Sequence, residues 1–261
     1  MTNPKIKLTL VVPLHNEADI LESSLAEFAA KFTSITSNSL AAEIDSVNAV
    51  IVENGSSDGS KADLEKLLLN QPYKNVFKIA GSIEPNAGLG FAYAKGLALA
   101  LKEHGTQENH WIMLSVLDLP FGFTDFDGFI CEQPKSPEVT VFIGSKAANG
   151  SEVDMGLKRK LANLVFRSLR FLVLGLKTKD PQGVIFVRSD KVAVVLEKIK
   201  SRNFFFTTEL IYALEKQSCQ IIELPVKYFG ERRKSSVRVF RDGLAVIKEL
   251  IRLRLSNLYG K

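Results

Sequence analysis

The feature of this sequence that most limits its fold is a series of short apolar segments, several of them hydrophobic at successive positions. Segments 47–54 (VNAVIVEN), 139–145 (VTVFIGS) and 183–189 (GVIFVRS) have the length of β-strands. A strand with one face in water alternates apolar and polar residues, whereas a strand covered on both faces is apolar throughout. These segments therefore predict an α/β fold with a mostly parallel, twisted sheet and helices on both faces.

Segments with helical periodicity separate the predicted strands along the chain. The predicted strands are 7–14, 47–54, 75–81, 111–119, 139–145, 183–189 and 221–229. The predicted helices are 17–33, 59–70, 89–103, 157–175, 190–200, 207–218 and 240–258. Strands and helices alternate strictly through residue 105, as in a doubly wound half, and the order is more mixed afterwards. Segment 132–138 is predicted to be a short loop. We expect one domain over 1–261, built from an N-terminal half (1–122) and a mixed C-terminal half (123–261).

Composition and charge exclude several classes of protein. A chain of 261 residues that is 46% hydrophobic has ample material for a core. The net charge of +5 is too mild to indicate nucleic-acid binding, but it suits anionic ligands or an anionic surface. We expect no signal peptide, no disulfide framework from the two cysteines, and no apolar run near the roughly 18 residues that span a bilayer.

Four polar clusters follow predicted strands or precede predicted helices. They are 13–17 (PLHNE), 53–59 (ENGSSDG), 86–96 (NAGLGFAYAKG) and 117–122 (LDLPFG). Ligands of parallel α/β sheets bind beyond the carboxyl ends of the strands, so four clusters at one sheet edge predict a single binding site.

The second and third clusters have a local explanation in terms of backbone geometry. Glu53 or Asn54 would present hydrogen-bonding groups at the strand end, and Gly55 and Gly59 would let the backbone turn tightly. Ser56 or Ser57 would cap the next helix. In 86–90 (NAGLG), the glycines would leave room for a ligand to approach the backbone, and the helix start would favour an anion.

In this order, VVPLHNE, VENGSSDGS, NAGLGFAYAKG and LDLP resemble the nucleotide-binding half of inverting GT-A glycosyltransferases of family 2. The later segments 179–186 (KDPQGVIF), 204–210 (FFFTTEL) and 231–239 (ERRKSSVRV) resemble the polyprenyl-phosphate branch, such as dolichyl-phosphate glucosyl- and mannosyltransferases. The resemblance covers nearly the whole chain. It implies a GT-A (Rossmann-like) fold, with 1–122 binding the nucleotide sugar and 123–261 binding the acceptor. The implied reaction moves a hexose from a nucleoside-diphosphate sugar to a polyprenyl phosphate.

The resemblance also implies which residues form the site. The residues expected to bind the nucleotide sugar are Pro13, Asn16, Glu17, Glu53, Asn54, Asp58, Asn86, Gly88, Gly90, Arg232, Arg233 and Lys234. Asp118 would hold Mg²⁺ or Mn²⁺ on the diphosphate. Gln182, in the turn that contains Asp180, would lie near the sugar. Glu209 is the third expected catalytic residue, in the motif of the presumed base.

Two departures from the family pattern bear on the acceptor. The Asp-x-Asp metal motif reads Val116-Leu117-Asp118, and the Phe-Asp-x-Glu-Leu motif carries Thr207 in place of its aspartate. Mg²⁺ commonly uses one or two carboxylates together with substrate phosphates, so Asp118 alone is compatible with metal binding. A phosphate monoester, with a second pKa of about 6, is already charged at neutral pH and needs no base. This favours a lipid phosphate acceptor. The alternatives are a saccharide hydroxyl, with Glu209 as base, and a catalytically silent nucleotide-sugar-binding homologue.

Two segments predict basic amphipathic helices. In 157–172 the apolar face comprises Leu157, Leu161, Leu164, Val165, Leu169 and Leu172, and the polar face comprises Lys160, Asn163, Arg167 and Arg170. In 239–261 the apolar stripe comprises Phe240, Leu244, Ile247, Ile251, Leu255 and Leu258. Such faces lie in a membrane interface or pack against the sheet or a partner chain. We therefore expect a cytoplasmic protein, either peripheral at the membrane or homo-oligomeric.

Overall fold

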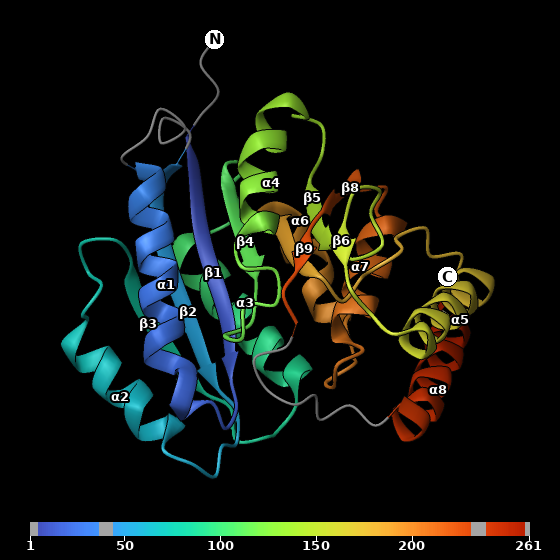
Figure 1. The fold of residues 1–261 in the computed structure, drawn as a ribbon, viewed down its shortest axis with the longest axis horizontal. Helices are drawn as coiled ribbons and strands as arrows, with labels where there is room; N and C mark the ends of the chain where they lie inside the picture. The colour runs from blue at the N-terminus through green and yellow to red at the C-terminus, as the bar shows by residue number, and fades with distance from the viewer. Residues whose placement is uncertain (1–4, 37–43, 231–238, 259–261) are drawn as a thin grey trace.

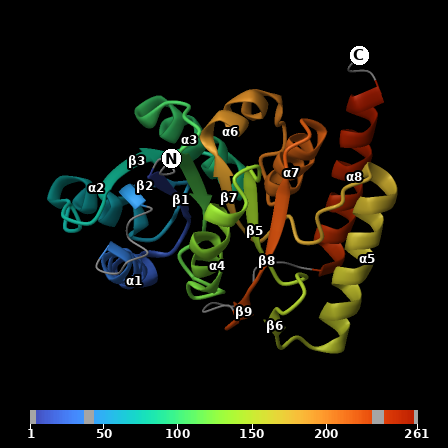
Figure 2. The ribbon, with the colours of Figure 1, turned by 90° about the horizontal axis from the view of Figure 1, so that it is seen from above.

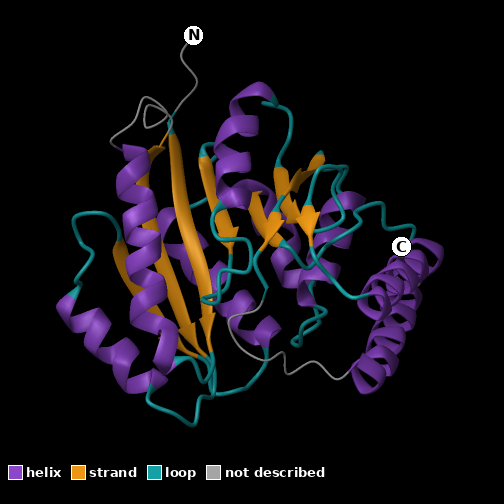
Figure 3. Ribbon diagram, in the orientation of Figure 1, coloured by secondary structure: helices purple, strands orange, loops and turns teal. Residues whose placement is uncertain are grey.

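The computed structural model describes residues 5–36, 44–230 and 239–258, so the predicted site residues Arg232, Arg233 and Lys234 lie outside the described part. One seven-stranded sheet runs through the molecule, with helices on both faces (Figures 1 and 3). Its strands are β1 (Ile6–Leu14), β2 (Ile44–Glu53), β3 (Lys78–Ile83), β4 (His110–Leu114), β5 (Val141–Ser145), β7 (Val184–Arg188) and β8 (Ile221–Pro225). Their order is β3-β2-β1-β4-β7-β5-β8, and β7 is antiparallel to both of its neighbours. Short strands β6 (Glu152–Val153) and β9 (Lys227–Tyr228) pair separately.

The helices form a layer on each side of the sheet. One face is covered by α1 (Ala18–Thr36), α2 (Ser60–Asn70) and α4 (Thr124–Glu132). The other is covered by α3 (Leu89–His104), α6 (Ser189–Val195) and α7 (Phe206–Lys216). Helices α5 (Leu157–Leu174) and α8 (Val239–Leu258) pack side by side at the end of the molecule near β8 (Figure 2). Two single turns of 3₁₀ helix, η2 (Gln133–Lys135) and η3 (Leu196–Lys198), follow α4 and α6.

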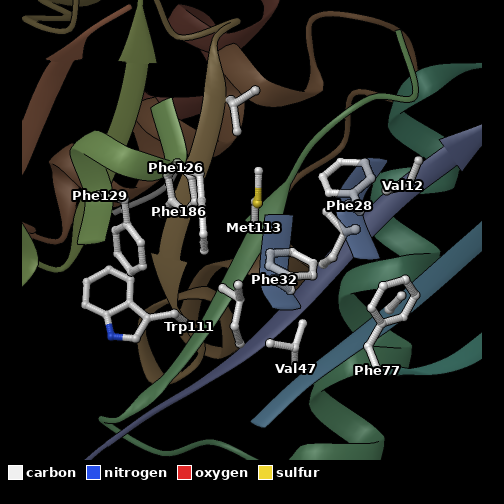
Figure 4. Packing of buried hydrophobic residues seen from close by; sticks show 14 of the residues in the cluster. Val12, Phe28, Phe32, Val47, Phe77, Trp111, Met113, Phe126, Phe129 and Phe186 are labelled. Atoms are coloured by element: carbon white, nitrogen blue, oxygen red, sulfur yellow. The ribbon is translucent and has the colours of Figure 1, made fainter. Parts of the chain in front are cut away.

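Alternate residues of the central strands contribute to two separate hydrophobic clusters. Val12 of β1 belongs to the cluster that contains Phe28 and Phe32 of α1 (Figure 4), whereas its neighbour Val11 belongs to the cluster under α3. The first cluster is rich in aromatic rings, and Phe129 of α4 stacks on Phe186 of β7 with 4.5 Å between centroids. Burial on both faces explains why the strands are apolar at successive positions, and it confirms the predicted layered fold.

The observed elements depart from the sequence-based expectations at several places. The strand expected over 221–229 is split, because β8 ends at Pro225 and β9 pairs with β6 outside the main sheet. Helix α4 was not predicted, because nine residues interrupted by Gly128 give only a weak helical pattern. The strand expected over 111–119 ends at Leu114, because the chain then leaves the sheet and Leu119 has a φ of +44°. The segment 132–138, expected to be a loop, contains η2. In the described ranges, every helix is too short or too polar to cross a bilayer.

Candidate functional site

The loops that carry the predicted site converge on one edge of the sheet. Strands β1, β2, β3, β4 and β5 all end there, and the antiparallel β7 begins there. The edge is therefore built from the loops 15–17, 54–59, 84–88, 115–123 and 146–151 and from the segment before Val184. This is the arrangement that the positions of the polar clusters predicted.

Asn16 joins the first two of these loops. Its backbone N–H donates to Ser56 Oγ at 3.1 Å, and its side-chain Oδ1 accepts from the backbone N–H of Ser57 at 2.7 Å. Asn16 itself has a φ of +55°, a left-handed conformation that asparagine tolerates better than most residues. Pro13, three residues earlier, is buried within β1 and pairs with Val52.

Glu53 and Asn54 end β2 as buried polar residues, 3% and 2% exposed. Glu53 Oε1 accepts from the Ser56 N–H at 2.6 Å, and the Asn54 carbonyl accepts from His15 Nδ1 at 2.9 Å. The side-chain Oδ1 of Asn54 is buried, and no hydrogen-bond partner for it exists in the described residues. An unsatisfied buried acceptor costs about 1–3 kcal/mol, so this amide oxygen is suited to a donor group of a ligand.

Asp58 holds the starts of two helices. Its carboxylate accepts from the Ala18 N–H, the first residue of α1, at 3.2 Å, and from the Ser60 N–H, the first residue of α2, at 2.9 Å. Burial alone would raise the pKa of this carboxyl, but the hydrogen bonds from Ser60 and Ala18 outweigh burial and lower the pKa. The expectation that Ser56 or Ser57 caps α2 is wrong, because the N-cap position is Gly59 and the first backbone N–H of the helix donates to Asp58 instead. Gly55 has the expected positive φ of +72°, whereas Gly59 has an ordinary φ of −75°.

Asp118 and Glu17 act on the same buried phenol. Tyr93 of α3 donates its hydroxyl hydrogen to the Ser115 carbonyl at 3.1 Å, at the end of β4. Burial, followed by the charges of Asp118 and then Glu17, raises the pKa of Tyr93. Both carboxylates are therefore within electrostatic reach of Tyr93, from the loops that follow β1 and β4.

This pair of carboxylates has the hard oxygen chemistry that Mg²⁺ and Mn²⁺ prefer. Within the ranges the structure describes, no cluster of three or more His, Cys, Asp or Glu side chains forms a metal cage. A cation shared with ligand phosphates needs fewer protein ligands than a closed cage, and Asp118 as the metal ligand stays a prediction.

The glycines at the start of α3 have a different role from the one expected. A Cβ on Gly90 would lie 2.6 Å from the carbonyl carbon of Arg202, and a Cβ on Gly88 would lie 2.7 Å from the Arg202 carbonyl oxygen. The space expected for a ligand is thus filled by the protein's own backbone. The Phe91 N–H, in the first turn of α3, donates to that same carbonyl, which removes one donor from the expected anion site. Asn86 is exposed and donates to Glu84 at 2.7 Å.

Glu209, in the first turn of α7, is 5% exposed and fully engaged in hydrogen bonds. Its carboxylate accepts from the N–H groups of Lys200 and Ser201 at 3.1 and 2.8 Å, and it pairs with Arg252 of α8 at 3.2 Å. These contacts fix the loop that packs on Gly88 and Gly90. The geometry gives Glu209 a positioning task, and its use as a base stays a prediction.

Gln182 is exposed just before β7, in the turn that contains Asp180. Asp180 accepts from the backbone N–H of Lys146 at 3.0 Å and lies 3.6 Å from its ammonium. Lys146, 24% exposed, also lies 5.3 Å from the centre of the Phe121 ring in the loop after β4. Sequence reasoning missed this cation. The sequence feature that could have indicated it is that Lys146 directly follows the predicted strand 139–145.

Comparison with known proteins supports the fold. No family model matches the chain, and no curated protein matches it. Over 97% of this chain and 79% of the other, the structure is similar to the crystal structure of glucosyl-3-phosphoglycerate synthase from Mycobacterium tuberculosis in complex with UDP. The TM-score is 0.58 at 13% sequence identity. The fold is of the GT-A, Rossmann-like type. This confirms the predicted fold class.

Two cytidylyltransferase structures resemble the chain more weakly. The enzyme from Francisella tularensis gives a TM-score of 0.43 at 12% identity, covering 94% of this chain and 100% of its own. The enzyme from Leptospira borgpetersenii serovar Hardjo-bovis gives a TM-score of 0.44 at 8% identity, covering 97% of this chain and 96% of its own. These scores are too low to support an argument about this protein.

Proposed function

We propose that this protein is an inverting glycosyltransferase that moves a hexose from a nucleoside-diphosphate sugar to a polyprenyl phosphate. The observation that supports it best is that Glu17, Asn54 and Asp118 follow the parallel strands β1, β2 and β4 and so lie at one edge of a GT-A-like sheet. The similar glucosyl-3-phosphoglycerate synthase structure holds UDP, which is the nucleoside-diphosphate part of a UDP-sugar donor.

The donor would lie across the ends of β1, β2 and β4. Glu53 and Asn54 would form the floor under the base and ribose, and the buried Oδ1 of Asn54 would accept from the nucleoside. Asn16 and Asp58 would keep the two surrounding loops in place. The exposed Asn86 would extend this surface, whereas Gly88 and Gly90 pack on the Arg202 backbone and Pro13 is buried in β1, so these three residues would support the surface from beneath.

Positive charge is needed where the leaving diphosphate forms. Asp118, with Glu17 nearby, would hold Mg²⁺ or Mn²⁺, which when bound offsets the growing phosphate charge. Lys146 is a second source of positive charge beside the loop that carries Asp118. Gln182, in the turn just before β7, would face the sugar.

The acceptor oxygen would be that of a phosphate monoester. One of its oxygens attacks the anomeric carbon, the bond from that carbon to the diphosphate oxygen breaks, and the electron pair leaves with the nucleoside diphosphate. The attacking oxygen carries no proton that must be removed. A saccharide hydroxyl would need Glu209 as base, but the Glu209 carboxylate already accepts three hydrogen bonds.

A donor screen tests this function. Wild type is incubated with UDP- and GDP-hexoses and with undecaprenyl or dolichyl phosphate, with Mg²⁺ or Mn²⁺, while calorimetry measures nucleotide binding. We expect Asp118→Asn to lower turnover by about 100-fold or more. Asp45→Asn, an exposed acid at the start of β2 on the opposite edge, is the matched control and should behave like wild type.

Three outcomes would contradict the proposal. Nucleotide binding without consumption of any donor would indicate a silent homologue. Transfer to saccharide hydroxyls alone would indicate the other acceptor class. Equal activity of Asp118→Asn and wild type would remove the metal assignment.

A further inference from the structure

Helix α5 exposes the apolar face that could have packed against the sheet. Five of the six predicted face residues are 57–84% exposed, and they are Leu157, Leu161, Leu164, Val165 and Leu172. We call this set the α5 face. Phe171, 58% exposed, lies beside it. Only Leu169, of the predicted set, is partly buried against the core. Solvent exposure of so many large apolar side chains on one helix is unusual for a surface that stays in water.

The way α5 is attached explains why this face remains free of the core. Leu169 and Val173 pack on the second hydrophobic cluster, and Arg170 donates to the Lys179 carbonyl at 2.9 Å. The helix is therefore anchored through one side, and the leucine-rich side points away from the protein's core.

Helix α8 lies beside α5 and repeats this pattern over its described side chains. Leu250 and Leu253 are buried, whereas Ile247, Ile251 and Leu255 are 38%, 50% and 47% exposed. Together the two helices form one end of the molecule (Figure 2).

The charge on these helices is strongly positive. Helix α5 carries five basic residues and no acidic one, namely Lys158, Arg159, Lys160, Arg167 and Arg170. Helix α8 adds four basic residues and two acidic ones, namely Arg241, Lys248, Arg252, Arg254, Asp242 and Glu249. Arg170 and Arg252 are held by contacts within the protein, whereas Lys160, Arg167, Lys248 and Arg254 are exposed. Exposed apolar and basic side chains on the same helices are complementary to anionic headgroups above a hydrocarbon layer.

We propose that the α5 face, with the exposed stripe of α8, docks on the surface of a bilayer that contains anionic lipid. A second copy of the chain is a poorer occupant, because self-association would bring two strongly basic helices together. Docking would hold the sheet edge close to a lipid acceptor, and this benefit rests on the proposed function. The docking itself requires no nucleotide.

Vesicle flotation of the full chain tests the proposal without any donor. The vesicles are phosphatidylcholine alone or phosphatidylcholine with phosphatidylglycerol. We expect wild type to float with the anionic vesicles only, and less at high salt. Leu172→Glu should lower the partition coefficient at least about tenfold. Leu69→Glu on α2, where the leucine is 84% exposed, makes the same chemical change elsewhere and should bind like wild type.

Each alternative occupant gives a distinct result that would overturn the proposal. If wild type remains in the unbound fraction when anionic vesicles float, docking is excluded. Equal binding by Leu172→Glu and Leu69→Glu excludes this face. If light scattering shows that wild type is a dimer and that Leu172→Glu is a monomer, the α5 face binds a second copy of the chain instead. Because no nucleotide is present, a failed donor screen leaves this result unchanged.

Discussion

Asp125, in the first turn of α4, is a buried carboxyl whose pKa is strongly raised by the fold. It is 2% exposed, and burial raises the pKa of its carboxyl to about 7, although hydrogen bonds from the N–H groups of Phe126 and Asp125 itself oppose the rise. The charge of Asp127 adds slightly to the rise, and that of Lys31 opposes it. A carboxyl with this pKa is partly protonated at neutral pH.

The raised pKa makes the stability of the protein depend on pH. The folded chain holds this proton up to about pH 7, whereas the unfolded chain loses it near 3.8, so stability falls as pH rises between these values. We expect Asp125→Asn to be more stable than wild type by a few kcal/mol at pH 8, with the difference vanishing toward pH 4. Urea unfolding followed by the fluorescence of the single tryptophan, Trp111, measures this. A difference that stays constant with pH would contradict the assignment.

Gly90 is predicted to be intolerant of any side chain. Its substitution by alanine would place a methyl group against the backbone of Arg202 and Asn203, at 2.6 to 2.8 Å. We expect Gly90→Ala to lose about 1–3 kcal/mol of unfolding free energy. Gly156→Ala, where no atom lies within 4 Å, is the control and should unfold like wild type. Equal stability of the two variants would contradict this prediction and show that the loop containing Arg202 and Asn203 can move to accommodate a methyl group.

Among the elements, α7, α8 and the loop 199–203 meet at Glu209, and a substitution there can distinguish a structural role of this residue from a catalytic one. Glu209→Gln leaves a backbone N–H poorly paired, so we expect a loss of about 1–3 kcal/mol in stability and weaker nucleotide binding, with kcat within severalfold of wild type.

Glu215 on the same helix provides the matched control. It accepts from the N–H groups of Lys177 and Thr178, in a different loop. Glu215→Gln should cost similar stability and leave nucleotide affinity unchanged. If Glu209 is instead the base, Glu209→Gln would abolish turnover while affinity and stability stay at wild-type values.

The sequence predicted the central elements because their signals are local. Val11 and Val12 face opposite clusters, so the apolar run alone indicated coverage on both faces. The direction of β7 could not be predicted, because strand polarity depends on the path of the connecting chain and leaves no periodic pattern. The polar residues at strand ends were likewise readable, whereas the packing of Arg202 on Gly90 joins residues 112 positions apart.

At the scale of the whole molecule, one sheet connects two exposed regions with different chemistry. The carboxyl edge holds Glu17, Asn54 and Asp118, and the end near β8 presents the α5 face. Arg252 of α8 reaches Ser201 at 2.8 Å, in the loop that packs on the start of α3. The proposed membrane and donor surfaces are therefore linked by direct contacts through this loop.

Binding of a donor at the carboxyl edge of the sheet can be tested by hydrogen exchange of the full chain with and without a nucleotide sugar and Mg²⁺. We expect slower exchange in the loops 15–17, 54–59 and 115–123. We expect unchanged exchange at the opposite edge, where Lys7, Asp45, Glu103 and His104 line a separate depression. Protection at that opposite edge, or unchanged exchange in all three loops at saturating ligand, would contradict this prediction.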